Sequence, residues 1–340
     1  MEEFGEQRKG WLEGFLTLPN GIPTSDTFRR VFERLNSKEL MKCLQKWLES
    51  TDQYKSGGRL VNIDGKTIRG SGLPNEERSA IHVVNAWVHE NEMILGQLET
   101  EEKSNEITAI PALLDMIDVR GDVVSIDAMG CQTQIAAKIR EKGADYILAV
   151  KDNHPTLHED IRAYFDWAVR EPEEIKAHHW RGTIEKDHGR IEQRAVTTIT
   201  DVEWLRRVGE WKDLRTLIRY RCTRSNKNGK TQTERFYISS FETTAEQFCY
   251  LIRDHWSIEN RLHWSLDVLF HEDSSTIKKG NAPANLSVLR KVALSRLKDT
   301  PTTRNISLRR KMLRAALDLD FLNLVIFRRY MRSPCLVLQL

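Results

Sequence analysis

The spacing of apolar residues divides the chain into three parts. Residues 1–55 place apolar side chains three and four positions apart, as in Phe28, Val31, Phe32 and Leu35, which predicts a helical N-terminal segment. From residue 56 the pattern changes to short β-branched and apolar runs. They predict strands at 59–63, 81–89, 92–98, 122–126 and 146–150, with helices at 106–117 and 133–142. This order predicts an α/β fold with a mixed sheet flanked by helices.

The second part continues with more strands and then a long helix. After a helix at 157–169, residues of about 180–240 are again strand-like, and Asn228-Gly229 between two such runs predicts a β-hairpin. A helix is expected from Ala245 to Phe270. We therefore predict a central domain at 56–272 with a β-rich insertion at about 180–240, followed by a helical segment at 273–340.

Charge separates the last segment from the rest. The net charge is +3, but residues 274–340 contain 14 Lys and Arg against three Asp, a charge of +11, so residues 1–273 carry −8. A basic segment on an acidic body predicts a polyanionic partner such as DNA or RNA, with solvated helix faces as the alternative.

Composition excludes several classes of protein. With 40% hydrophobic and 30% charged residues, the chain is neither a membrane protein nor a disordered one. It has no apolar run of about 18 residues and no signal-peptide pattern, so we expect a cytoplasmic protein without a membrane partner. The five cysteines include no C-x-x-C pair, which argues against a disulfide framework and a thiolate zinc site.

Three carboxylates are candidates for the functional site. Asp64 and Asp127 each follow a short apolar strand, and groups just past strand ends in an α/β sheet converge on one crevice. Glu259 lies on the stripe Ile252, Trp256, Glu259, His263, Leu266 and Phe270 of the long helix, where an acid needs a cation or a basic partner. The alternatives are turn or helix-capping roles for the two aspartates and a surface ion pair for Glu259.

A set of three acids favours one kind of chemistry. Two divalent ions about 4 Å apart, held by shared carboxylate oxygens, activate an attacking oxygen and stabilise a leaving oxygen in phosphoryl transfer. Because the expected ligands are all oxygen, two Mg²⁺ ions fit better than Zn²⁺, with Mn²⁺ as a substitute.

Four motifs carry a resemblance to a known family. They are Ile63-Asp64-Gly65-Lys66-Thr67, Ser125-Ile126-Asp127-Ala128-Met129, Asp187-His188-Gly189-Arg190-Ile191-Glu192-Gln193-Arg194 and His255-Trp256-Ser257-Ile258-Glu259-Asn260-Arg261-Leu262-His263-Trp264. In this order they resemble the insertion-sequence DDE transposases of the H-repeat-associated (ISAs-type) group, over nearly the whole chain. The resemblance implies a ribonuclease H-like fold and a metal-dependent nuclease and strand transferase, with Asp64, Asp127 and Glu259 as its catalytic and metal-binding acids.

The resemblance also implies double-stranded DNA as partner, both element ends and target, and a homo-oligomer formed on it near the nucleoid. Related transposases often have Tyr, Arg and Lys where this chain has Ile252, His255 and Leu266, so those DNA contacts do not transfer. The candidate DNA contacts are Lys66, Arg69, Lys151, Asn153, His188, Arg190, His255, Lys278 and Lys279.

Two other functions stay open. His255, Glu259 and His263 at i, i+4 and i+8 could hold Zn²⁺ in a metallohydrolase. The end of the chain, Ser333 to Leu340, is unlike the group, which leaves room for an inactive transposase relic that only binds DNA.

Overall fold

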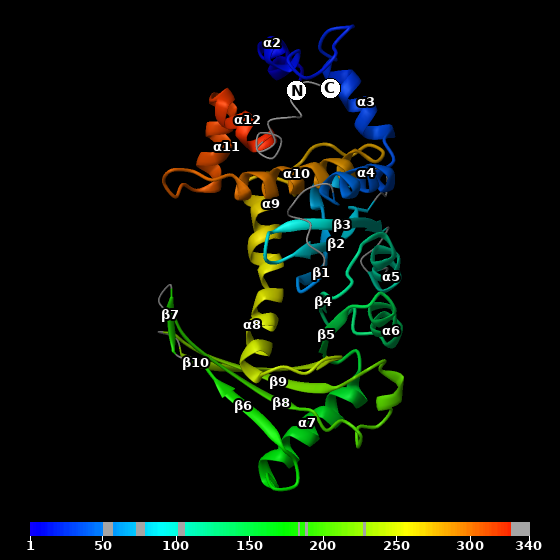
Figure 1. Ribbon diagram of the computed structural model, residues 1–340, viewed down its shortest axis with the longest axis vertical. Helices are drawn as coiled ribbons and strands as arrows, with labels where there is room; N and C mark the ends of the chain where they lie inside the picture. The colour runs from blue at the N-terminus through cyan, green and yellow to red at the C-terminus, as the bar shows by residue number, and fades with distance from the viewer. Residues whose placement is uncertain are drawn as a thin grey trace.

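A ten-stranded mixed sheet forms the middle of the molecule (Figure 1). The computed structural model describes residues 1–49, 57–72, 79–100, 106–182, 184–187, 190–226 and 229–327. Along the sheet the strands follow the order β3-β2-β1-β4-β5-β10-β9-β8-β6, and β7 pairs with β8. The first five strands are β1 (Leu60–Thr67), β2 (His82–Val88), β3 (Met93–Thr100), β4 (Val123–Ile126) and β5 (Asp145–Val150).

Strands β1, β4 and β5 are parallel, whereas β2 and β3 continue from β1 as antiparallel strands. The crossovers contain α5 (Glu106–Met116) and α6 (Thr133–Glu141), which pack on one face of the sheet, while α8 (Ala245–His255) lies on the other (Figure 1). Apolar side chains of β1 and β4 such as Val61 and Ile126 form the core with α5 and α6. This arrangement confirms the predicted mixed sheet and fits the ribonuclease H-like fold.

The β-rich insertion extends the same sheet. It follows α7 (Pro155–Arg170) and consists of β6 (Ala177–Arg181), β7 (Glu185–Asp187), β8 (Arg190–Ile199), β9 (Thr216–Asn226) and β10 (Gly229–Ser239). The predicted hairpin is confirmed as β9 and β10, although its turn residues 227–228 lie outside the described residues. Strand β10 pairs antiparallel with β5, a junction that the sequence did not predict.

The long helix predicted at 245–270 is interrupted. It consists of α8, a π-helical segment Ile258–His263 (η5) and α9 (Trp264–Val268). Prediction of one continuous α-helix was wrong because apolar spacing over six residues does not distinguish i→i+4 from i→i+5 hydrogen bonding. Single π-helical turns inside α-helices are rare and occur frequently at functional sites.

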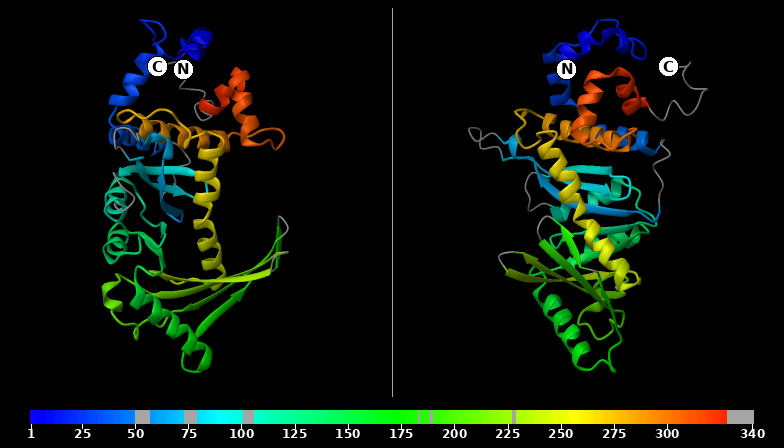
Figure 2. Two further views of the ribbon diagram at one scale, coloured as in Figure 1. Left: turned by 180° about the vertical axis from the view of Figure 1, so that it is seen from behind. Right: turned by 90° about the vertical axis from the view of Figure 1, so that its left-hand side faces the viewer.

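Helices from both ends of the chain gather at the end opposite the insertion (Figure 2). These helices are α1 (Glu2–Gln7), α2 (Lys9–Leu12), α3 (Ser25–Arg34), α4 (Ser37–Glu49), α10 (Ala282–Asp299), α11 (Leu308–Leu317) and α12 (Leu319–Phe327). The indole of Trp11 donates to Asn323 at 2.8 Å, and Asn285 donates to the carbonyl of Leu35 at 2.8 Å. In the part of the chain described, no helix combines the length and apolar character needed to cross a membrane.

Candidate active site

Asp64 and Asp127 occupy equivalent positions on neighbouring parallel strands. Ile63 of β1 pairs with Ile126 of β4, and each aspartate is the next residue after that pair. The sequence indicated that Asp64 directly follows the end of its strand. In the structure Asp64 lies within the strand, because β1 continues to Thr67 along β2. It is the parallel pairing with β4 that ends there. Residues in parallel register point to the same face, so both carboxylates lie on the face covered by α8.

Glu259 reaches the same place from the π-helical segment. It lines one pocket of about 100 Å³ together with Asp64 and Asp127. Glu259 is exposed at this pocket rather than buried on an inward stripe, while its neighbours Ile258 and Leu262 face the core. The sequence placed Glu259 on the apolar stripe of the long helix, and this placement was wrong because Glu259 is exposed. The remaining lining residues are Ala128, Ala149, Val150, Lys151, Arg235, Phe236, Tyr237, His255 and Trp256.

The crowding of acids changes the ionisation of Asp64. Burial, together with the charges of Asp127, Glu259 and Glu106, raises the pKa of Asp64 to about 8. The Nδ1 of His263 lies 3.7 Å from Oδ2 of Asp64, but burial and the nearby Lys291 and Lys66 lower the pKa of His263 to about 3. The imidazole is therefore neutral and does not supply the positive charge that the three acids require.

A chain of hydrogen bonds ties α8 to the two aspartate-bearing strands. Asn62 donates to the carbonyl of Asp254 at 3.1 Å, so its Oδ1 is free to accept from Ser125 Oγ at 2.7 Å. The same hydroxyl lies 2.7 Å from Nδ1 of His255. Sequence reasoning missed this chain. Its signal was a polar residue two positions before each aspartate in an otherwise apolar strand.

A buried histidine–carboxylate pair supports β1 from the opposite face. Nε2 of His82 lies 2.6 Å from Oε1 of Glu106, and Nδ1 of His82 lies 2.9 Å from Oγ1 of Thr67. Both side chains of the pair are buried, directly beneath Gly65. A side chain at position 65 would collide with both. The glycine after Asp64 is therefore required by packing, and the pair holds the strand at the point where it carries the first acid.

The donor set suits a hard divalent cation. Asp64, Asp127 and Glu259 present carboxylate oxygens to one pocket, and burial together with the charges of the neighbouring acids raises the pKa of Asp64, an effect that a bound cation would oppose. Among the described residues no three His, Cys, Asp or Glu side chains are already arranged to hold a metal ion.

Two basic side chains face this pocket. Lys151, one of the predicted DNA contacts, follows β5 and is exposed. Arg235 of β10 also lines the pocket, and its guanidinium lies 3.9 Å from the ring centroid of Trp256. Arg235 was not predicted, because nothing in the sequence indicated that β10 pairs with β5. Together they place positive charge beside the acids.

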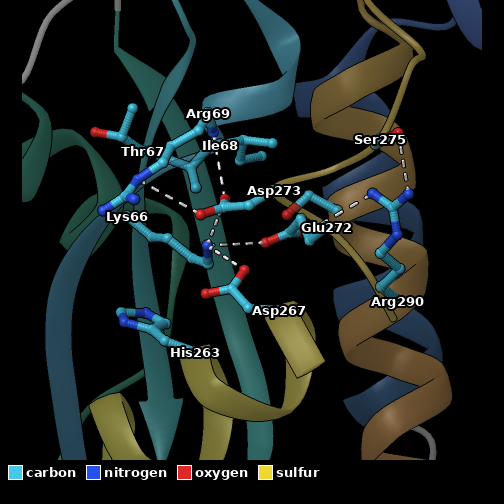
Figure 3. Close-up of polar contacts among 12 residues, drawn as sticks. Lys66, Thr67, Ile68, Arg69, His263, Asp267, Glu272, Asp273, Ser275 and Arg290 are labelled. Carbon is cyan, nitrogen blue, oxygen red and sulfur yellow. Dashed lines mark hydrogen bonds and ion pairs between the residues drawn. The ribbon is translucent and has the colours of Figure 1, made fainter. Parts of the chain in front are cut away.

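Lys66 does not reach the surface. Its side chain is 7% exposed and lies on the same face of β1 as Asp64, two residues further along. Nζ is 2.8 Å from Asp267 Oδ1 and 3.0 Å from Asp273 Oδ1, with the buried Glu272 at 3.7 Å (Figure 3). This cluster joins β1 to α9 and to the segment after it, so Lys66 is not available to DNA in this structure.

The other predicted DNA contacts are scattered. Arg69 has an 83% exposed side chain beside Asp273, whereas Asn153 donates to the carbonyl of Ala128 and joins the loops after β5 and β4. His255 points into the pocket from α8 rather than outward. Lys278 and Lys279 lie between α9 and α10 and do not line the pocket. His188 lies outside the described residues, and Arg190 begins β8.

Part of the basic C-terminal segment is used inside the protein. Lys291 is 2% exposed and hydrogen-bonded to Gln97 and Ser287. Lys311 donates to the carbonyls of Leu297 and Thr300 at the end of α10. These cations are helix and core contacts, so the charge of +11 overstates what this segment offers a polyanion.

The sequence was compared with known proteins. A family model described as "Transposase DDE domain" matches residues 55–295, which include all three acids, and one described as "DDE_Tnp_1-associated" matches residues 1–48. "Putative transposase YncI" of Escherichia coli O157:H7 is 39% identical over 96% of this chain and 83% of the relative. "H repeat-associated putative transposase YhhI" of Escherichia coli (strain K12) is 39% identical over 95% of this chain and 85% of the relative.

One solved structure has a loose similarity to this chain. It is titled "Cryo-EM structure of piggyBac transposase synaptic complex with hairpin DNA (SNHP)". Its TM-score is 0.41 at 10% identity, over 87% of this chain and 62% of that chain. The fold described above therefore rests on the strand order and the family match.

Proposed function

Because this chain belongs to the insertion-sequence transposases of the DDE family, we propose that Asp64, Asp127 and Glu259 are the catalytic acids of a DNA transposase. The observation that carries this assignment is the strand register, which makes Asp64 and Asp127 neighbours on one face, with Glu259 lining the same pocket. The reaction is hydrolysis of a phosphodiester at each element end, followed by attack of the freed 3′-hydroxyl on a phosphodiester of target DNA, which joins the element to the target and releases a 3′-hydroxyl of the target strand.

Transposases of this family generally use divalent metal ions. We assign two Mg²⁺ ions to the three carboxylates, with Mn²⁺ as a substitute, because the donors are all oxygen. When bound, the ions activate the attacking oxygen and stabilise the leaving oxygen.

The chain's own residues supply the rest of the site. Lys151 and Arg235 hold the negatively charged scissile phosphate at the pocket, and stacking on Trp256 fixes the Arg235 guanidinium. The Ser125 hydroxyl donates its proton to Asn62, so Nδ1 of His255 must donate to the Ser125 oxygen. The neutral His255 ring therefore has its Nε2 unprotonated. That nitrogen is a hydrogen-bond acceptor for a water or hydroxyl in the pocket.

Two element ends must be cut and joined to one target. This requirement favours a homo-oligomer assembled on DNA, acting on chromosomal DNA in the cytoplasm. We propose the domain limits 1–55, 56–272 and 273–340. Helices of the first and third parts pack together, so these two parts are separate in the sequence but adjacent in space.

The deciding experiment measures cleavage of a duplex that carries the element end, with Mg²⁺, with Mn²⁺ and with chelator. We expect metal-dependent cleavage that Asp64→Asn, Asp127→Asn and Glu259→Gln each abolish while leaving DNA binding intact, because an amide keeps the shape but not the charge. Lack of cleavage by the unmutated protein with any metal would favour the inactive relic. Bound zinc that is lost in His263→Ala would favour the metallohydrolase, which the family match does not support.

A further inference from the structure

A second group of basic side chains lies on the insertion, on the face turned towards α7. The register aligns His179 of β6, Thr197 of β8 and Arg219 of β9 in one row across three strands. Arg181 and Arg221 belong to the next row on the same face. A cavity of about 670 Å³ opens over these rows. Helices α7 and α8 lie on opposite sides of the insertion sheet (Figure 1). Because Arg219 of the lining contacts Phe165 of α7, the cavity lies on the side away from α8 and from the pocket with the three acids.

Arg219 is the unusual member of this group. Its side chain is 3% exposed, and its guanidinium lies 4.9 Å from the ring centroid of Phe165. The Nε atom is buried without a hydrogen-bond partner, and the nearest acid, Asp166, is 3.7 Å away and largely exposed. An arginine offers five N–H donors, and buried donors without acceptors are costly. Burial and the charge of Arg221 lower the pKa of Arg219, so its positive charge is poorly compensated.

The rest of the lining adds donors and no acid. His179 bonds Thr197 through Nδ1 at 3.0 Å, and Arg221 reaches Glu234 at 2.6 Å, while Arg181 is exposed. The remaining polar side chains of the lining are amides and hydroxyls, without a carboxylate. Arg181, Arg219 and Arg221 together carry more charge than the two acids that pair with them, Glu234 and Asp166, and this excess of positive charge is complementary to an anion.

We propose that this cavity, the α7-side anion pocket, binds backbone phosphates of duplex DNA at a surface separate from the catalytic pocket. The planar guanidinium groups of Arg181, Arg219 and Arg221 match the geometry of phosphate oxygens. The choice of DNA among phosphate ligands rests on the proposed function. Because the pocket faces away from the three acids, the DNA segment it holds is not the one being cut at that site.

The test replaces Arg181, which is exposed, and Arg221, which is half-buried with a side chain 40% exposed, so that no fully buried residue is changed in the double variant. Full-length protein and its Arg181→Gln/Arg221→Gln variant are titrated with a duplex of unrelated sequence at several salt concentrations. We expect weaker binding and a slope of log affinity against log salt that is smaller by about 0.9 for each phosphate that the variant no longer neutralises. Arg215→Gln is the matched control, since Arg215 is exposed next to β9 but does not line the cavity. Arg219→Lys, which keeps the charge but not the planar fork, should weaken binding as well.

An unchanged salt slope in the double variant, or a change equal to that of Arg215→Gln, would overturn the inference. Inorganic phosphate is the second probe. If it shifts the NMR signals of His179 while the double variant binds DNA normally, the pocket takes small anions and the DNA assignment fails.

Cleavage of the element end by the unmutated protein is scored separately. A cleaving enzyme with an unchanged slope disproves only this surface, whereas an altered slope without cleavage disproves only the proposed activity.

Discussion

Ser125 holds His255 in one tautomer. The Ser125 hydroxyl donates to Asn62 Oδ1, so Nδ1 of His255, 2.7 Å from the same oxygen, must carry the proton that joins them. Burial lowers the pKa of His255 to about 4, so the ring is neutral near neutral pH. The end of α8 is thereby attached to both aspartate-bearing strands just before the chain enters the π-helical segment.

Removing the Ser125 hydroxyl tests this attachment. Ser125→Ala leaves Nδ1 of His255 and Oδ1 of Asn62 without their partner, and we expect a loss of about 1–3 kcal/mol in the free energy of unfolding. Denaturant titration measures the loss, and ¹⁵N chemical shifts of His255 report the tautomer. Ser274→Ala, at an exposed serine, should change stability by less than about 0.5 kcal/mol. Equal stability of both variants would show that the chain of hydrogen bonds does not hold α8.

Lys66 should matter for stability rather than for DNA binding. Lys66→Met leaves the fully buried Glu272 without its nearest cation, and breaking a buried ion pair in this way costs about 3–5 kcal/mol. Arg69→Met removes an exposed ion pair to Asp273 and should cost no more than about 1 kcal/mol. Thermal unfolding compares the two variants. A stable Lys66→Met protein with weakened DNA affinity would restore Lys66 as a DNA contact.

Gly65 is expected to tolerate no side chain. In Gly65→Ala the new Cβ meets Oε1 of Glu106 and Nε2 of His82, so either the pair separates or β1 moves. We expect a loss of about 1–3 kcal/mol, as is typical of overpacking, together with reduced cleavage because Asp64 is displaced. In contrast, Gly10→Ala lies in α2 with no atom within 4 Å of the added Cβ, and it should stabilise the helix by up to about 1 kcal/mol. The same denaturation assay serves for both.

Lys291 predicts a rise of stability with pH. Burial lowers the pKa of Lys291 to about 8, whereas the unfolded chain has the ordinary lysine value of about 10.4. Between these values the unfolded chain binds more protons, so this contribution to stability increases with pH. The cost of burying the charged lysine reduces the free energy of unfolding in full below about pH 8 and is absent above about pH 10.4, a change of about 3 kcal/mol. The difference in unfolding free energy between wild type and Lys291→Met should follow this curve, and a flat difference would mean that Lys291 keeps an ordinary pKa.

Local pattern was sufficient for much of the fold. Alternation and β-branching identified the strands that carry Asp64 and Asp127. The rule that groups just past strand ends converge on one crevice predicted that these two acids lie together. Pairing between β5 and β10 could not be read from the sequence, because the pairing of strands far apart in the chain is decided by packing. Arg235 therefore went unnoticed as a residue of the pocket.

Charge patterns were more misleading than apolar ones. Arg290-Lys291 looks like a surface pair in the sequence, yet Lys291 is enclosed by Gln97 and Ser287. Likewise Lys66 next to Asp64 resembled a phosphate contact, although its acidic partners come from a segment about 200 residues later. A charged residue in a sequence does not reveal its partners, so its burial depends on tertiary structure.

The antiparallel pairing of β10 with β5 has a mechanical consequence. A domain attached through a linker can swing to meet its substrate, but an insertion whose strands continue the catalytic sheet can swing only by breaking main-chain hydrogen bonds. Arg235 and Lys151 therefore keep a fixed separation from the acids while the protein searches for DNA. Any adjustment between this platform and DNA therefore falls to side chains, to loops or to the DNA itself.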